Sequence, residues 1–203
     1  GTWTRKSDLG SYLRAYAPGF SMGMKGYIVA GCNLLSDLWE YDQVTGRWNP
    51  KANPFPLPYL KLKSAGFTIG TKGYFGTGLD NATNYTNDFW GWDQTNNVWT
   101  QMANFGGTIR DNAVGFSVGT KGYMGCGRYV NTHYNDFWEY DPATNNWLQK
   151  ANFAGAPRSL ATGFSIGAKG YVGTGVDNTF YYNDFWEYDP TLDIWLQKAN
   201  FGG

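Results

Sequence analysis

Residues 163–175 read GFSIGAKGYVGTG, residues 183–190 read NDFWEYDP, and residues 195–201 read WLQKANF. The same order of motifs occurs four times along the chain: an opening phenylalanine, a Lys-Gly-Tyr turn, and an aspartate followed by aromatic residues. Each unit closes on a tryptophan, and these tryptophans are 51, 48 and 48 residues apart: Trp48, Trp99, Trp147 and Trp195. A fixed period of about 50 residues indicates a repeat architecture.

Each unit contains four segments with the pattern of a short strand. In the second unit these are AGFTIG at 65–70, YFGTGL at 74–79, DFWGWD at 88–93 and VWTQMANF at 98–105. The composition agrees, because 19% of the residues are aromatic and 28 are glycine, which suits strands and tight turns better than helices. The sequence therefore predicts an all-β fold, a β-propeller of four four-stranded antiparallel blades, at residues 14–53, 61–105, 110–153 and 158–201.

Units of this form resemble the kelch repeat family, in particular the bacterial surface kelch-repeat proteins related to the galactose oxidase propeller. The resemblance covers essentially the whole chain and recurs in all four units. The sequence departs from the family on the second strand, where Gly76-Thr77-Gly78 and its equivalents replace the paired glycines of many kelch repeats. The resemblance implies the propeller fold but indicates no particular ligand.

The first ten residues match the end of a blade. Trp3 precedes Arg14 by eleven residues, which is also the separation of Trp99 from Arg110. Residues 1–10 are therefore predicted to be the outermost strand of a preceding or closing blade, one copy more than the other three strands have. Three explanations are open: a segment of a longer propeller, a small closed ring with a spare strand, or an assembly of copies. We expect an isolated monomer to be poorly soluble or to self-associate.

The loops that follow the second strand of each blade differ from one another, whereas the tight turns on the opposite face are nearly identical. Divergent loops on a uniform scaffold are where recognition is usually carried, and tyrosine with asparagine suits a glycan or a peptide ligand. The alternative is that these side chains cap the blade edges and pack between loops. The candidate ligand-binding side chains on these loops are Tyr85, Tyr129, His133, Tyr134, Phe180 and Tyr181.

One basic residue stands six positions before the opening phenylalanine of each blade: Arg14, Lys61, Arg110 and Arg158. In a closed ring these residues would surround the mouth of the central channel, where guanidinium groups with little counter-charge would bind an acidic ligand. The resemblance supports this hypothesis, because kelch propellers often hold acidic groups with arginines at this mouth. The alternative is an arginine paired with a neighbouring blade's carboxylate or with loop carbonyls. The repeated aspartates, which we interpret as blade-to-blade structural groups, are Asp37, Asp88, Asp136 and Asp184.

The residue inventory argues against an enzyme and against a cofactor. His133 is the single histidine, which excludes the copper centre of galactose oxidase and any repeated histidine-based metal site. A hydrolase that uses two carboxylates is a further alternative, with Asp80, Asp111 and Asp177 as its candidates. The predicted function is a non-catalytic binding or scaffolding propeller for a glycan or an acidic peptide. The alternative is a structural repeat that self-assembles into a larger propeller.

Charge and hydropathy limit the partners further. Lysine plus arginine equals aspartate plus glutamate at 16 each, so no basic field for nucleic acid is expected. No apolar run approaches the roughly 18 residues that a membrane helix needs, so no membrane insertion is expected. Low charge with abundant Asn, Thr and Tyr predicts an extracellular or bacterial cell-surface location. The partners expected are a glycan or protein ligand, and either further blades or a homo-oligomer.

Overall fold

The structure, a computed structural model, describes residues 1–10, 13–31, 36–51, 61–80 and 84–202, and all regular elements in these ranges are strands. Four four-stranded antiparallel sheets form the four blades, each in the order of the sequence. The first blade holds β1 (Gly19–Met22), β2 (Lys25–Val29), β3 (Leu38–Asp42) and β4 (Arg47–Pro50). The second holds β6 (Ala65–Ile69), β7 (Lys72–Gly76), β10 (Phe89–Asp93) and β11 (Val98–Met102).

The last two blades repeat the same plan. The third holds β12 (Val114–Val118), β13 (Lys121–Gly125), β16 (Phe137–Asp141) and β17 (Asn146–Lys150). The fourth holds β18 (Thr162–Ile166), β19 (Lys169–Gly173), β20 (Phe185–Asp189) and β21 (Ile194–Lys198). All four sheets lie within the predicted blade boundaries, and the predicted all-β propeller architecture is confirmed.

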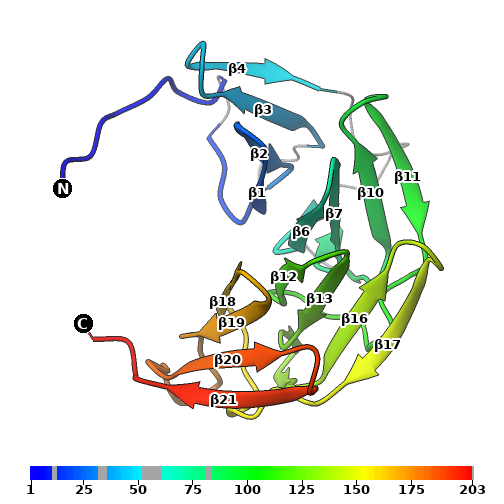
Figure 1. Ribbon diagram of the computed structural model, residues 1–203, viewed down its shortest axis with the longest axis vertical. Helices are drawn as coiled ribbons and strands as arrows, with labels where there is room; N and C mark the ends of the chain where they lie inside the picture. Colours follow the sequence, from blue (N-terminus) through cyan, green and yellow to red (C-terminus); the bar gives the residue numbers. More distant parts are fainter. Residues whose placement is uncertain (11–12, 32–35, 52–60, 81–83, 203) are drawn as a thin grey trace.

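The blades stand side by side along an arc (Figure 1). The first strand of each blade lies on the inner side of the arc and the fourth strand lies on the outer side (Figure 1). Among these inner strands, β6 packs against β1 and β12, and β12 packs against β18. The first and fourth blades are at the two ends of the arc, so each has one flank without a neighbouring blade in this chain (Figure 1).

Turn chemistry explains why the strands end where they do. Gly70 follows β6 with φ of 58°, and the corresponding glycines of the other blades have φ of 57–59°. A positive φ at the first central residue of a two-residue turn is the II′ geometry that matches the twist of a hairpin. In the outer turn of the second blade, Asp93 Oδ1 accepts from the backbone amides of Thr95 at 2.8 Å and Asn96 at 3.3 Å.

Neighbouring blades interlock through a phenylalanine and a glycine. The ring of Phe67 on β6 lies against Gly122 on β13, where any Cβ would come closer than 3.0 Å to the ring. Phe20 lies against Gly73 in the same way, 2.6 Å from the position that a Cβ would take, and Phe116 lies against Gly170. This contact explains why the Lys-Gly-Tyr turn has glycine at its second position, because a larger side chain there would push the two blades apart.

A line of backbone hydrogen bonds follows the inner side of the arc. The amide of Lys63 donates to Tyr16 O at 3.1 Å, Asn112 donates to Lys63 O at 2.8 Å, and Leu160 donates to Asn112 O at 3.2 Å. All four residues have φ between 51° and 59°, which is uncommon for residues other than glycine. This strained conformation is therefore tied to the junctions between blades.

The loop face carries short strands that the sequence pattern did not predict. A three-stranded sheet joins β5 (Lys61–Leu62), β8 (Leu79–Asp80) and β9 (Asn84–Tyr85) in the second blade. A two-stranded sheet joins β14 (Arg128–Tyr129) and β15 (Thr132–His133) in the third blade. These pairings order the bases of the variable loops in the second and third blades.

Residues 1–10, predicted as the outermost strand of a preceding or closing blade, form no strand in the structure. None of these residues pairs into a sheet, because no third strand of another blade lies beside them to supply hydrogen bonds. One contact nevertheless agrees with the predicted alignment of residues 1–10 to the outermost strand of a blade. Ser7 O accepts from the indole of Trp48 at 3.1 Å, as Ala103 O accepts from Trp147 at 3.1 Å. Within the described ranges, no helix is long and apolar enough to cross a membrane.

Candidate functional site

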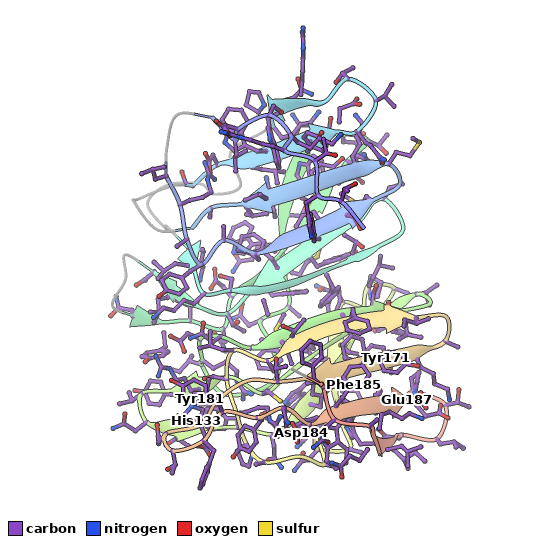
Figure 2. The ribbon with its side chains drawn as sticks, turned by 90° about the vertical axis from the view of Figure 1, so that its left-hand side faces the viewer. His133, Tyr171, Tyr181, Asp184, Phe185 and Glu187 are labelled. Carbon is purple, nitrogen blue, oxygen red and sulfur yellow. The ribbon has the colours of Figure 1, made fainter. Side chains whose placement is uncertain are left out.

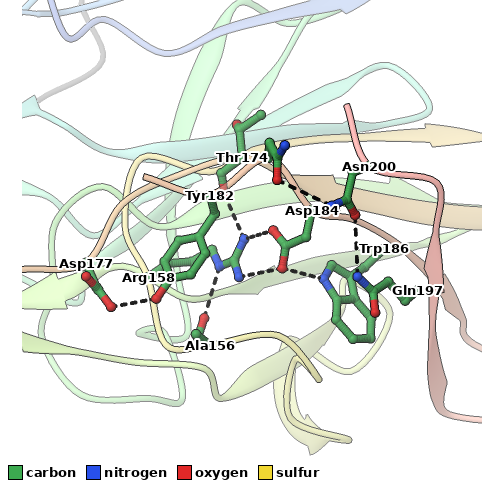
Figure 3. Close-up of polar contacts among 10 residues, drawn as sticks. Ala156, Arg158, Thr174, Asp177, Tyr182, Asp184, Trp186, Gln197 and Asn200 are labelled. Atoms are coloured by element: carbon green, nitrogen blue, oxygen red, sulfur yellow. Dashed lines mark hydrogen bonds and ion pairs between the residues drawn. The ribbon is translucent and has the colours of Figure 1, made fainter. Parts of the chain in front are cut away.

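The base of each variable loop holds a buried ion pair. Arg158 is fully buried and meets Asp184 through two parallel hydrogen bonds, of which Nη2 to Oδ2 measures 2.8 Å (Figure 3). Arg158 also donates to the carbonyls of Ala156 at 3.0 Å and Thr174 at 2.9 Å. The third blade repeats the arrangement, with Arg110 bound to Asp136, Thr108 and Cys126.

Aromatic rings cover the guanidinium groups on both faces. The ring of Tyr182 lies 4.0 Å from the Arg158 guanidinium carbon, and the ring of Phe153 lies 4.9 Å from it. Tyr134 covers Arg110 in the same way, at 4.3 Å. Planar cations between rings are favourably placed, and the rings exclude water from the ion pair.

The first two blades contain variants of the same pair. Arg14 binds Asp37 through two hydrogen bonds of 2.8 and 2.9 Å. Lys61 replaces the arginine in the second blade and donates to Asp88 and to Thr86 Oγ1. Burial lowers the pKa of Lys61 even though Asp88 opposes the shift.

The hypothesis of an unpaired basic ring at the channel mouth is therefore corrected. Each basic residue has an aspartate as its counter-charge, and Lys61, Arg110 and Arg158 are at most 1% exposed. The aspartates were interpreted as links between blades, but each binds the basic residue of its own blade. The alternative of a neighbouring blade's carboxylate is also corrected, although the expected carbonyl acceptors are present for Arg110 and Arg158. A buried guanidinium group needs both a carboxylate and hydrogen-bond acceptors.

These ion pairs set the protonation of the aspartates. Burial raises the pKa of Asp184, but hydrogen bonds from Arg158 and Trp186 outweigh it and hold the pKa below its usual value. The pKa of Asp37 is also low, since Arg14 and Trp39 outweigh its burial. Both carboxylates are therefore charged at neutral pH and neutralise the adjacent guanidinium groups.

The predicted aromatic ligand residues divide into three groups. Tyr134 is part of the guanidinium stack, because its ring lies over the Arg110 guanidinium group. Tyr85 and Tyr129 come together from two blades, with ring centroids 4.9 Å apart in an edge-to-face contact. Phe180 and Tyr181 are 62% and 89% exposed at the tip of the fourth blade's loop.

His133 belongs to the region between the loops of the third and fourth blades. In Figure 2, His133 and Tyr181 lie at the same end of the molecule. The Asn178 side chain links the two loops by donating to Asn131 O at 2.8 Å. Burial, followed by the nearby Arg128, lowers the pKa of His133, so its imidazole is neutral at pH 7.

A cavity of about 410 Å³ opens beside the loop of the second blade. Its lining combines the aromatic rings of Tyr85 and Trp90 with carboxylate and amide side chains. Tyr85 is the residue here that the sequence identified as a ligand candidate, apart from Lys61, whose ammonium group is bound to Asp88. The remaining lining residues are Asp80, Thr86, Asn87, Asp88, Gln101 and Ile109.

Two of the three carboxylates considered for hydrolysis have local structural roles. Asp111 is 1% exposed and binds Arg128 at 3.2 Å. Asp177 accepts from Tyr182 and from two amides of its own loop, which lowers its pKa to about 2. A general acid needs a raised pKa, so Asp177 is suited to holding its loop. Among the residues that the structure describes, no group of three or more His, Cys, Asp or Glu side chains could hold a metal ion.

Comparison with known proteins identifies the fold. A scan against protein-family models gave no match, and a search of curated proteins gave none either. Among solved structures, YjhT, a kelch-repeat β-propeller protein, matches 92% of this chain with a TM-score of 0.79 and 16% sequence identity. The match covers 66% of YjhT, so the chain spans about two thirds of that protein's length. The chain is thus a propeller of kelch-type blades.

Sequence reasoning found the basic residues but not what they bind. A usable signal was present, since each arginine or lysine precedes an aspartate of its blade by 23, 27, 26 and 26 residues. The role of Tyr182 was also missed, although it stands two residues before Asp184, as Tyr134 stands before Asp136. For the cavity there was no comparable signal, because its lining residues, from Lys61 to Ile109, come from several strands and loop segments rather than from one motif.

Proposed function

We propose that this protein is a non-catalytic binding propeller and that the cavity beside the second blade's loop binds a neutral glycan. The observation that carries the proposal is the joint lining by Tyr85, Trp90 and polar side chains. Aromatic faces pack against the C–H groups of a sugar ring, while carboxylate and amide groups pair with its hydroxyls. Asp80, Asn87 and Gln101 supply these polar groups.

The charges at this cavity favour a neutral ligand over an acidic one. The Lys61 ammonium is already bound to Asp88, and Asp80 adds a second carboxylate to the same lining. An acidic peptide would bring negative charge toward this surplus carboxylate, which is unfavourable where little water separates the charges. The acidic-peptide half of the expected function is therefore not part of the proposal.

The location and the lack of catalysis are parts of the same proposal. Neutral glycans are abundant outside cells, and the low charge and the Asn, Thr and Tyr content of the chain suit an extracellular or cell-surface protein. The carboxylates Asp111 and Asp177 are engaged in loop contacts, which supports binding without hydrolysis.

A panel of neutral oligosaccharides tests the proposal. The best ligand is titrated calorimetrically against the wild type and against Tyr85→Ala, which we expect to weaken binding at least tenfold. Tyr181→Ala is the matched control, because Tyr181 is 89% exposed and does not line the cavity. Unchanged affinity of Tyr85→Ala, or binding of acidic peptides alone, would overturn the proposal. Product release that is lost in Asp80→Asn would show a hydrolase instead.

A further inference from the structure

The junction between blades is built from two halves that every blade carries. The opening phenylalanine of one blade fills the space above the turn glycine of the next, as Phe67 does at Gly122 and Phe116 does at Gly170. The two flanks of a blade are therefore complementary surfaces. A flank without a neighbour in the chain presents one half of this junction.

The phenylalanine half is open on the fourth blade. Phe164 is 42% exposed, whereas Phe67 and Phe116 are 4% and 3% exposed. Figure 2, viewed from the open side of the arc, shows Tyr171, Phe185 and Glu187 on this blade. An apolar hollow of about 210 Å³ lies on the same flank, and its lining includes Phe164 and Phe185.

The glycine half is open on the first blade. A Cβ added at Gly26 would meet only the Tyr41 Cβ, at 3.9 Å, whereas the equivalent glycines are all covered by a phenylalanine ring. Tyr41 is half-buried, although its equivalents Tyr140 and Tyr188 are completely buried by the tyrosine of the preceding blade. The first blade therefore has an unfilled place for Phe164 and another for Tyr171.

In the part of the chain that the structure describes, the line of backbone hydrogen bonds along the inner side of the arc leaves one unpaired backbone group at each end. Within the described ranges, no hydrogen bond is made by the Leu160 carbonyl or by the Tyr16 amide, the two ends of the line. A second repeated bond runs from Gly127 N to Arg158 O at 2.7 Å, and from Gly78 N to Arg110 O at 2.7 Å. If the fourth blade of one copy lay beside the first blade of another, both repeated bonds could form between the two free flanks.

Residues 1–10 cover the outer part of the first blade's flank. Ser7 O accepts from the indole of Trp48, and Leu9 has the register of Phe105, Phe153 and Phe201. Where two blades of this chain meet, the side chain at this position is buried, as for Phe153, which is 1% exposed. At the free end of the fourth blade, the equivalent Phe201 is 65% exposed. Leu9 therefore stands where a phenylalanine from another fourth blade would pack.

We infer that the fourth blade of one copy docks onto the first blade of a second copy, with residues 1–9 competing for the outer part of the contact. Phe164 packs on Gly26, Tyr171 on Tyr41, and Phe201 displaces Leu9. A second copy is the partner because the complement of each free flank is found on this same chain. The contact is head-to-tail, so two copies form a ring if the curvature closes and an open chain if it does not.

Light scattering over a dilution series measures the association. We expect removal of residues 1–9 to strengthen self-association at least tenfold, because the competitor is gone. Adding Gly26→Ala to the truncated chain returns it to the monomer, since the new Cβ occupies the space needed by the Phe164 ring. Leu148→Ser is the control, because Leu148 is 59% exposed on β17, away from both flanks. The circular dichroism spectrum verifies that each variant is folded.

A mixing experiment tests the head-to-tail geometry in the full chain and does not depend on the truncation. Phe164→Ser keeps an intact first blade, and Gly26→Ala keeps an intact fourth blade. Neither variant associates alone, but an equimolar mixture forms a heterodimer. A truncated chain that stays monomeric, a mixture that stays monomeric, or a Phe164→Ser variant that associates like the wild type would each overturn the inference.

Discussion

At the scale of single residues, the glycine of each Lys-Gly-Tyr turn decides how closely two blades approach. Gly122 faces a ring of the preceding blade, whereas Gly26 faces open space in the same chain. Both glycines lie in second strands that begin with Lys-Gly-Tyr, and neither has a positive φ. The same substitution at the two glycines therefore distinguishes the effect of packing between blades from the effect on strand propensity.

We expect Gly122→Ala to lower the free energy of unfolding by about 1–3 kcal/mol, because the methyl group forces the Phe67 ring out of the junction. Gly26→Ala should change it by less than about 0.5 kcal/mol. Chemical denaturation of dilute protein, where the chain is monomeric, measures both values. Equal effects of the two substitutions would contradict the packing argument.

The buried ion pair of the fourth blade is a second feature of single residues. Asp184→Asn removes the counter-charge from a completely buried guanidinium group. We expect a loss of about 3–5 kcal/mol in the free energy of unfolding, since an uncompensated charge is costly away from water. The double variant Arg158→Met/Asp184→Leu should lose less than Asp184→Asn alone. A smaller loss in the single variant would show that water reaches Arg158.

The low pKa of Asp37 and Asp184 predicts a loss of stability in acid. In the unfolded chain each carboxyl titrates near the usual 3.8, and in the folded chain it titrates below that value. The stabilisation is complete above the unfolded value and is lost as the pH falls through 3.8 toward the folded pKa. Denaturation midpoints measured from neutral pH downward should show this fall, and Asp184→Asn should show a shallower one.

At the scale of elements, the segment after each outermost strand joins two blades. Phe153 follows β17 and packs against Trp186 and Trp195 of the next blade, with ring centroids 5.8 and 5.0 Å apart. It also covers one face of the Arg158 guanidinium group. The outer strand therefore contributes to the stability of the following blade as well as its own.

We expect Phe153→Ala to cost about 3–5 kcal/mol, as is usual for a phenylalanine removed from a core. Phe201→Ala has the same register in the sequence but removes a ring that is 65% exposed, so its cost should stay within about 0.5 kcal/mol. Urea denaturation of the two variants in parallel makes the comparison. A comparable cost for Phe201→Ala would mean that this ring is buried in solution.

At the scale of the whole molecule, the contacts between the strands of different blades in the described ranges join neighbours along the arc (Figure 1). The stability of such an array is approximately the sum of the intrinsic stabilities of its units and of the contacts between neighbouring units. A unit at the end has one such contact instead of two, so it is less stable against local unfolding. The fourth blade has one neighbour, and the first residue of β18 is exposed where that of β12 is buried.

Hydrogen exchange should therefore be faster in β18 and β19 than in β12 and β13. The two hairpins have closely similar sequences and the same register of pairing, so local sequence effects largely cancel. The measurement is made on dilute protein by mass spectrometry of matched peptides. Equal protection in both hairpins would show that the fourth blade has a further neighbour in solution.

Much of the fold followed from local patterns. Strand alternation, the glycine of the two-residue turn and the spacing of tryptophans act over a few residues, so they are readable without any tertiary contact. The predicted blade boundaries contain every strand of the four blade sheets. The short strands of the loop face were not predicted, because β8 pairs with β5 seventeen or more residues away and neither has a clear alternation.

The sequence by itself determined the all-β class, the four blades and their strand order, because periodicity and turn chemistry are local properties of the chain. Only the tertiary structure decided that the basic residues bind the aspartates of their own blades, that Tyr85 and Gln101 share a cavity, and that residues 1–10 form no strand. Ion pairs and cavities depend on distances between residues far apart in the sequence. A strand also needs a partner strand, and a segment's own pattern does not supply one.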